Sequence, residues 1–447
     1  MIWSIAEFEK VYGSDSTAAE SEKRGLVALP PKHIESLKEL IAVQPQRCDD
    51  NDASAILALS HQRGIGDVVS ARNYVGTISF ANGDQLEILP KLAKTFDRDN
   101  DGEKERLRAV LIRMLRAAFD LDAKSASVSD QRLARLPVLE AFFKAFLDCV
   151  ADIVRHGLAG GYSRVEGNEP FFKGKLLVAQ HLRENIVRKD RFFVAYDSFR
   201  SNMPANRLLR SGIDFVLANS SFDENKVAAH RLTAAFEDVP SSANLAADFA
   251  ACTPPPRDQR YREALAWCDI FLRGHSLANL PGTKRAKAFL FPMEALFERY
   301  VAKSLRKAAP SDIRVVTQAK DIWLRSSAPV DSLVIRPDIL LRRESDGAIL
   351  AVMDTKWKLL GTSLQHSGVS QADFYQLVAY QRHHGADEAV LVYPWHSELG
   401  ELADTPPLYA HETDSPRIRI AFFDVASPED AAKSTLSHCL RVAETVN

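Results

Sequence analysis

The 447-residue sequence contains little cysteine and no cysteine pair at short spacing. Its five cysteines are scattered, and no C-x-x-C motif suggests a zinc site or a redox dithiol. No apolar run approaches the length that spans a membrane. Acidic residues interrupt the N-terminal segment where a signal peptide needs an unbroken apolar core. We therefore expect a protein of the reducing cytoplasm without a membrane segment.

Nucleotide-binding and common hydrolase motifs are also missing. There is no G-x-x-x-x-G-K-[ST] loop, and the nearest glycine clusters, Gly64-Ile65-Gly66 and Gly160-Gly161, lack the lysine and hydroxyl that a phosphate cradle requires. No G-x-S-x-G or Cys/His constellation is present either. His383-His384 is interpreted as a polar helix end, because adjacent residues do not share a helix face. The chain is expected to bind no nucleotide cofactor itself.

A surplus of positive charge is absent as well. The formal net charge is −2, so the whole molecule lacks the positive field of a protein that holds DNA by itself. Any contact with nucleic acid must be local or supplied partly by a partner. Candidate DNA-binding residues are Lys284, Arg285, Lys287 and Lys358, and the first three could equally form a solvated linker.

The composition is that of a folded multidomain protein. Hydrophobic residues make up 46% and charged residues 26% of the chain, near the globular average. The length exceeds that of a usual single domain. We predict an N-terminal β module plus helices in 1–160, which would bind a partner. An α/β segment would follow in 161–256, ending in the proline-rich linker Pro254–Pro256, and a further domain would occupy 257–447.

The N-terminal module is predicted from its turn and strand signals. Short apolar or alternating runs between Ala53 and Leu92 indicate strands, and Asn82-Gly83-Asp84 marks a hairpin turn. A proline-initiated helix precedes them near Pro31, and apolar residues three and four apart predict helices from Leu107 to about His156. Because exposed loop tips on a rigid scaffold commonly carry function, the hairpin turn is our candidate for the partner contact.

The last third of the chain alternates helical and strand patterns. Its segments, in order, are PMEALFERYVAKSLRKA, IRVVTQ, SLVIRPDILLR, AILAVMDTKWK, QADFYQLVAYQRHH and EAVLVYP. Their periodicities predict a helix, three strands, a helix and a strand. The order αβββαβ is that of an α/β layered domain.

Two acids and a lysine are expected to meet on one hairpin of this domain. For a turn centred near Asp346, Asp338 falls opposite Asp354, to within one residue of register. Side chains alternate along a strand, so Lys356 should share the face of Asp354 while Thr355 points away. Two neighbouring carboxylates can share a hard cation such as Mg²⁺, and a lysine can orient the attacking water in phosphodiester hydrolysis.

A simpler interpretation stays open from spacing alone, because D-x-K on a strand is a common coincidence. The hairpin could lie at a solvent-facing edge and carry an ordinary Asp–Lys pair. Burying unpaired charge in an apolar strand pair is costly, however, and such a breach of local rules often marks a functional site.

The two motifs RPDILL and MDTKWK resemble the PD-(D/E)XK nuclease superfamily. The resemblance implies that Asp338 and Asp354 bind metal and that Lys356 acts on the water. Gln376 and Tyr380 form a Q-x-x-x-Y pair on one helix face, similar to the RecB-like branch, where these residues support the site and contact DNA. The preceding helix offers Glu294 and Glu298, and the LFERY portion favours Glu298 as the acid near the metal. The glutamates could also lie on a solvated helix face, and Gln376 and Tyr380 could serve packing.

Several further segments narrow the resemblance to the McrC family, the nuclease subunits of McrBC-type restriction systems. They occur in the same order over roughly Asn73 to Pro394: GTISFANGDQLEILPKL, EGNEPFFKGKLLVAQHLREN, RFFVAYDSFRSNMPANRLL, FLFPMEALFERYV and RPDILL with DTKWK. The resemblance implies a DNA endonuclease that uses Mg²⁺, with Mn²⁺ as an alternative. It also implies a McrB-like AAA+ GTPase partner that recognises modified double-stranded DNA. Two alternatives are a non-catalytic assembly factor that stimulates the partner NTPase and a stand-alone RecB-like repair nuclease.

Overall fold

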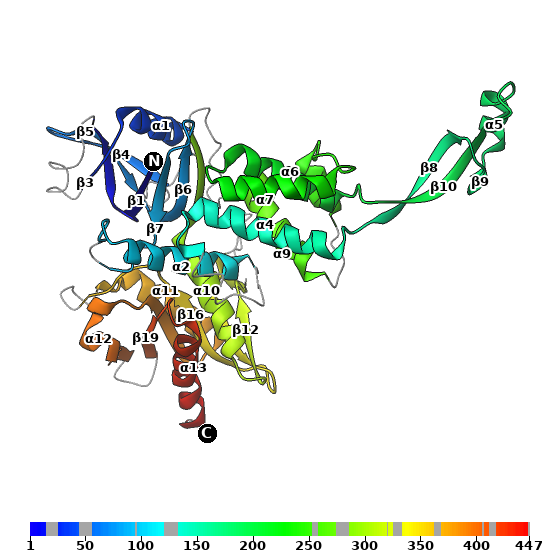
Figure 1. Ribbon diagram of the computed structural model, residues 1–447. Helices are drawn as coiled ribbons and strands as arrows, with labels where there is room; N and C mark the ends of the chain where they lie inside the picture. The colour runs from blue at the N-terminus through cyan, green and yellow to red at the C-terminus, as the bar shows by residue number, and fades with distance from the viewer. Residues whose placement is uncertain are drawn as a thin grey trace. The chain divides into compact units, whose positions relative to one another are not determined.

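The computed structural model divides the chain into two compact units (Figure 1). One consists of Met1–Val138 together with Ser276–Asn447, and the other is Leu139–His275. The structure describes residues 1–14, 26–43, 56–93, 96–119, 133–252, 258–273, 286–319, 321–324, 333–361, 368–404, 406–410 and 417–445. Within these ranges, no helix is long and apolar enough to cross a membrane.

The N-terminal part of the first unit contains two four-stranded sheets. One has the order β1 (Ile2–Ala6), β7 (Gln85–Leu89), β6 (Tyr74–Phe80) and β11 (Ala286–Pro292). The other has the order β3 (Leu26–Leu29), β2 (Lys10–Gly13), β5 (Gly66–Ala71) and β4 (Leu57–Gln62). Helix α1 (Pro31–Ala42) starts at a proline, as predicted. The predicted hairpin is also confirmed, because β6 and β7 pair antiparallel and Gly83 has a φ of 85°.

Strand β11 explains why the first unit is discontinuous in sequence. It pairs antiparallel with β6 along its whole length, so the chain returns to the N-terminal sheet after the second unit. The two strands approach so closely that a Cβ at Gly76 would lie 2.0 Å from the carbonyl oxygen of Phe289. The predicted boundaries at 160 and 256 therefore differ from the observed division after Val138 and before Ser276. A pairing across about 200 residues leaves no local signal in the sequence.

The C-terminal part of the first unit is built on a six-stranded mixed sheet. Its order is β12 (Ile313–Thr317), β15 (Ile339–Arg343), β16 (Ile349–Thr355), β17 (Glu388–Pro394), β19 (Arg417–Phe423) and β18 (Leu408–Ala410). The helices of this part are α2 (Asp101–Ala118), α10 (Met293–Ala308), α11 (Gln371–His384), α12 (Glu401–Asp404) and α13 (Pro428–Thr445). All residues of β17 are buried, as expected for a central strand with parallel neighbours on both sides.

The elements predicted as αβββαβ are all present from α10 to β17, with two differences, and the first is β13 (Asp321–Leu324), a strand that we did not predict. The second is that the expected single strand over SLVIRPDILLR is divided into β14 (Leu333–Ile335), which pairs with β13, and β15. The division falls at Arg336-Pro337-Asp338. Proline has no backbone N–H to donate to a ladder, so it ends one pairing before the next begins. The mixed α/β class that we predicted is confirmed.

The second unit is helical and carries an arm. Its helices are α4 (Val138–His156), α6 (Pro204–Asn219), α7 (Asp223–Thr233), α8 (Leu245–Ala251) and α9 (Gln259–Leu272). The arm, defined as residues 161–200, consists of β8 (Gly161–Glu169), β10 (Phe192–Arg200), β9 (Lys175–Leu176) and α5 (Val178–Glu184). Figure 1 shows it extending away from the helices of this unit. The predicted proline-rich linker Pro254–Pro256 lies outside the described residues.

Candidate functional site

Two adjacent strand ends bring the predicted acids together. Strands β15 and β16 pair antiparallel with Ile339 opposite Met353. Continuing this register by one residue places Asp338 opposite Asp354, as the sequence predicted. Asp338 directly precedes β15, and Asp354 is the penultimate residue of β16. The register therefore juxtaposes two carboxylates at one edge of the hairpin.

Asp338 is held in place by Thr355. The backbone N and the Oγ1 hydroxyl of Thr355 each donate to Asp338 Oδ2 over 2.8 Å. We expected Thr355 to point away from the cluster, and that expectation is wrong. Strand β16 ends at Thr355 and β15 begins only after Asp338, so strict alternation does not govern this corner. The threonine hydroxyl leaves the other oxygen of Asp338 available.

Asp354 and Lys356 form a close ion pair beside Asp338. Asp354 is 3% exposed, and its Oδ2 lies 2.7 Å from Lys356 Nζ. Burial, and next the charge of Asp338, raise the pKa of Asp354 to about 6. Burial by itself lowers the pKa of Lys356, but the carboxylates of Asp354, Asp373 and Asp338 together outweigh it and the net shift is upward. Asp373 lies 4.0 Å from the same ammonium, and we did not predict its presence.

Glu298, from α10, faces the same cluster. Burial raises the pKa of Glu298, and the charge of Asp338 raises it further. The Nε2 of Gln318 donates to Glu298 Oε1, while the backbone N of Gln318 donates to the Asp338 carbonyl over 3.1 Å. Glu294 is exposed. Of the two glutamates on α10, Glu298 is therefore the one that interacts electrostatically with Asp338.

Gln376 and Tyr380 contact each other on α11. The Nε2 of Gln376 donates to the Tyr380 hydroxyl over 2.7 Å, as expected for residues one turn apart. Tyr380 is 7% exposed and belongs to the core beneath α11, whereas Gln376 is exposed. Within the part of the chain that the structure describes, neither side chain hydrogen-bonds to Asp338 or Asp354. Packing explains Tyr380, and a role in DNA contact stays a prediction.

The predicted DNA-binding residues do not form one patch in the described structure. Lys284 and Arg285 lie outside the described residues. Lys287 is exposed on β11, opposite Ser79, and so belongs to a different sheet from the carboxylates. Lys358 Nζ donates to the Gly368 carbonyl over 2.6 Å. Their role as DNA contacts remains a prediction.

A buried contact between the N-terminal sheet and the site was not foreseen. Glu7, fully buried after β1, accepts hydrogen bonds at Oε2 from Trp357 Nε1 over 2.8 Å and from the Lys91 backbone N over 2.9 Å. Burial raises the pKa of Glu7 to about 8. Trp357 follows Lys356 and packs edge-on against Phe297 of α10, with ring centroids 5.2 Å apart. The contact spans 350 residues, and the sequence gives no signal for it.

The chemistry of the donors fits a hard divalent cation. Asp338 and Asp354 offer carboxylate oxygens, and the charge of Asp338 raises the pKa of both Asp354 and Glu298. Among the described residues, no group of three or more His, Cys, Asp or Glu side chains is arranged to hold a metal ion. Mg²⁺ needs no such group, because it usually binds through one or two carboxylates together with waters and substrate phosphates.

Comparison with known proteins places this arrangement in a family. One similar structure is a refined half-complex from a tetradecameric assembly of Thermococcus gammatolerans McrB AAA+ hexamers with bound McrC. The TM-score is 0.71 at 18% identity, and the match covers 98% of this chain and 100% of that chain. Another is the cryo-EM structure of the Thermococcus gammatolerans McrBC complex, with a TM-score of 0.51, 19% identity, and coverage of 69% and 89%. At these identities the likeness shows the fold alone.

The sequence itself carries the family assignment. No curated protein matches the chain. Residues 69–394, however, match the family described as McrBC 5-methylcytosine restriction system component. These residues include both acids and Lys356, and they span nearly the same stretch as the segments that predicted the resemblance to McrC. That prediction is therefore confirmed: the chain belongs to the family of McrBC 5-methylcytosine restriction system components.

Proposed function

We propose that this chain is the Mg²⁺-dependent DNA endonuclease subunit of a McrBC-like restriction system. The observation that carries the proposal is the meeting of Asp338, Asp354 and Lys356 at two adjacent strand ends of a mixed sheet, in a domain that contains the elements predicted as αβββαβ. This is the arrangement expected of a PD-(D/E)XK nuclease. Neither the buried Asp354 nor its charged neighbours are needed to close an apolar core, and hydrolysis of a phosphodiester gives them a purpose.

Each residue has a distinct task in this proposal. Asp338 and Asp354 would hold the cation, with Thr355 fixing the orientation of Asp338. A bound Mg²⁺ would supply Lewis-acid polarisation and lower the pKa of a water molecule. Lys356 keeps its proton beside Asp354 and orients the attacking water, since a raised pKa keeps the ammonium charged at neutral pH. Glu298 assists from α10.

A partner would license the cutting. The solved complex contains McrB AAA+ hexamers with bound McrC, and we extend this association to the present chain. A net charge of −2 and the lack of a phosphate-binding loop support the same division of labour. The partner, a McrB-like AAA+ GTPase, would recognise modified DNA and supply the energy for movement along it.

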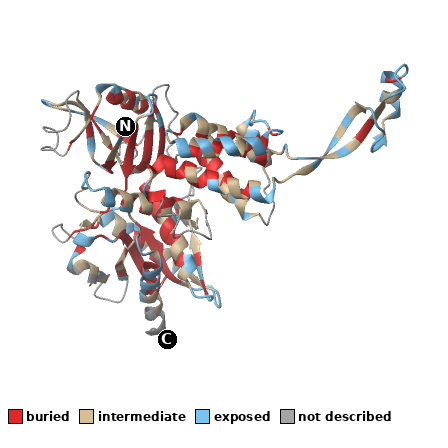
Figure 2. Cartoon of the chain, in the orientation of Figure 1, coloured by how far each residue is buried: buried red, intermediate tan, exposed pale blue. Residues whose placement is uncertain are grey.

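The arm offers a better docking surface than the hairpin turn that we first considered. Large apolar side chains are exposed along it, namely Tyr162, Phe171, Phe172, Val178, Leu182, Ile186 and Val187. Figure 2 shows much of the arm in the colour of exposed residues. Such a concentration of exposed apolar groups is typical of a protein interface. In the turn, by contrast, Asp84 lies 2.5 Å from the Met1 amino group and 3.1 Å from His33 Nε2. These contacts give the turn a structural role.

Reconstitution tests the function. We expect the purified chain to cut modified plasmid poorly alone and efficiently with its GTPase partner, GTP and Mg²⁺. Ca²⁺ should permit binding without cutting, because its looser coordination activates water poorly. Undiminished cleavage in excess EDTA would exclude the metal mechanism, and equal cleavage without the partner would identify a stand-alone nuclease. Stimulation of the partner GTPase without any cleavage would identify an assembly factor.

A further inference from the structure

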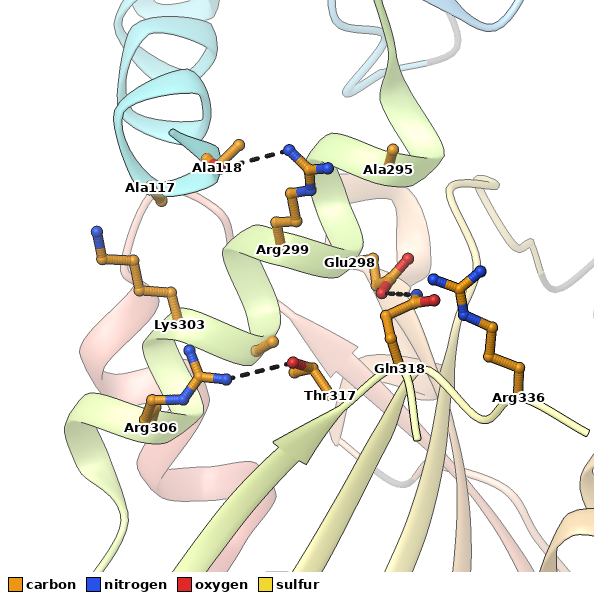
Figure 3. Close-up of a pocket in the computed structure, with 11 residues that line it drawn as sticks. Ala117, Ala118, Ala295, Glu298, Arg299, Lys303, Arg306, Thr317, Gln318 and Arg336 are labelled. Carbon is orange, nitrogen blue, oxygen red and sulfur yellow. Dashed lines mark hydrogen bonds between the residues drawn. The ribbon is translucent and has the colours of Figure 1, made fainter. Parts of the chain in front are cut away.

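A basic pocket contains Glu298, the acid of α10 that faces Asp338 (Figure 3). It has a volume of about 300 Å³ and lies between α10, the C-terminal end of α2 and the end of β12. Its charged lining residues are Glu298, Arg299, Lys303, Arg306 and Arg336. Four cations therefore surround one carboxylate, in a chain whose overall charge is slightly negative.

The arginines of this pocket make few contacts of their own. Arg299 reaches the Ala118 carbonyl and Arg306 reaches Thr317 Oγ1, each at 3.5 Å, the limit of hydrogen bonding. Arg336 is exposed in the segment that precedes Asp338. Across the residues that the structure describes, none of these three arginines has a carboxylate within ion-pair distance. The three arginines carry more positive charge than the single carboxylate of Glu298 offsets, and an anionic ligand would relieve their mutual repulsion.

Gln318 joins this pocket to the catalytic cluster. Its side chain donates to Glu298 within the pocket, and its backbone N donates to the Asp338 carbonyl over 3.1 Å. Arg336 lies two residues before Asp338 along the chain. The positive charges of Arg299 and Arg336 also lower the pKa of Glu298, against the stronger upward effect of its burial. An anion in the pocket would therefore lie beside the acids that would hold the metal.

We propose that this pocket binds the phosphodiester backbone of the DNA strand next to the scissile phosphate. The inference rests on the proposed nuclease function and names its substrate contacts. Arg299 and Arg306 are seven residues apart on α10, which separates their Cα atoms by about 10 Å along the helix. Neighbouring phosphates of one strand lie farther apart than their axial rise of about 3.4 Å, so this row can contact about two of them. Guanidinium groups suit the task, because they bind phosphate oxygens in a bidentate manner.

Salt-dependent binding tests the proposal on the full chain. The probe is an unmodified fluorescent DNA duplex in Ca²⁺, so that no cleavage occurs, titrated at several salt concentrations. We expect the double variant Arg299→Gln and Arg306→Gln to reduce the slope of log affinity against log salt by about two. Duplex affinity at low salt should fall on the order of tenfold. Arg314→Gln is the matched control, because Arg314 lies exposed on β12, outside the pocket, 3.8 Å from Glu344.

The outcomes separate this inference from the nuclease proposal. An unchanged slope and affinity in a double variant with wild-type thermal stability would overturn the pocket assignment, as would a wild-type chain that binds no duplex at low salt. Loss of inorganic phosphate binding with unchanged duplex binding would identify a small-anion site and also overturn it. A reduced slope without any cleavage by the reconstituted wild type would support the pocket and refute only the nuclease proposal.

Discussion

The six-stranded sheet and the arm depart from ordinary burial in opposite directions. The sheet buries charge: Asp354 is 3% exposed at the end of a strand whose other residues are mostly apolar. The arm exposes apolar surface: Phe171 and Val187 are 76% and 86% exposed. Buried charge is costly unless it is paired or serves chemistry, whereas exposed apolar surface is costly unless a partner covers it. The contrast agrees with our proposal that the sheet carries the chemistry and the arm binds the partner.

The largest expected effect is the loss of cleavage when the site on the six-stranded sheet is changed and the arm is left intact. Asp354→Asn and Lys356→Ala should each reduce cleavage of modified plasmid by at least about a hundredfold in the reconstituted system, because they remove a metal ligand and the group that orients the water. Partner binding should stay normal, since neither residue lies on the arm. Cleavage rates and co-purification with the partner measure the two effects.

Asp346→Asn is the matched control for the first of these variants. It makes the same chemical change on the same hairpin, at a side chain that is 51% exposed and paired with Arg343. We expect it to retain wild-type cleavage. Full activity of both Asp354→Asn and Lys356→Ala would refute the assignment of the site.

The juxtaposition of Asp338 and Asp354 could be predicted because both lie on one short hairpin. Asp338 and Asp354 are 16 residues apart, and the turn between them fixes which positions face each other. The helical periods that predicted α10 and α11 are equally local. The Thr355 contact was missed because it lies at a strand end, where alternation no longer decides direction. The pairing of β11 with β6 was missed because it joins segments that only the folded chain brings together.

A smaller effect is expected when apolar residues of the arm are changed and the site on the sheet is left intact. Phe171→Ser or Val187→Ser should weaken binding of the GTPase partner by about tenfold each, the effect of losing one buried apolar anchor at an interface. Val43→Ser is the control, because Val43 is also exposed but follows α1 in the other unit. Surface plasmon resonance with the partner and GTP measures the affinities. If both arm variants bind like the Val43 control, the arm is not the docking surface.

The smallest expected effect concerns Glu7, a buried acid outside the proposed catalytic site. It tests whether a buried carboxyl affects only stability or also the reaction. Glu7 is as buried as Asp354, yet its carboxylate accepts hydrogen bonds from Trp357 and Lys91. Its pKa is raised to about 8 from an ordinary value of 4.5. At pH values below the ordinary pKa, Glu7 is protonated in both the folded and the unfolded chain. As the pH rises toward 8 only the unfolded chain ionises, so stability is lost progressively through this window.

Glu7→Gln should remove this pH dependence, because glutamine keeps an oxygen that accepts from Trp357 and Lys91 but cannot ionise. Relative to wild type, the Tm of the variant should therefore rise by several degrees between about pH 6 and about pH 9. Glu35→Gln is the control, since Glu35 is 60% exposed and its variant should follow wild type at both pH values.

Cleavage at about pH 7 should persist in Glu7→Gln, in contrast to Asp354→Asn, because the neutral carboxyl and the amide present the same acceptor to Trp357. An equal Tm difference at both pH values would show that Glu7 does not hold its proton on folding. A loss of cleavage as large as that of Asp354→Asn would show that Glu7 also serves the reaction. In that case Glu7 could not be distinguished from Asp354 as a purely structural buried acid.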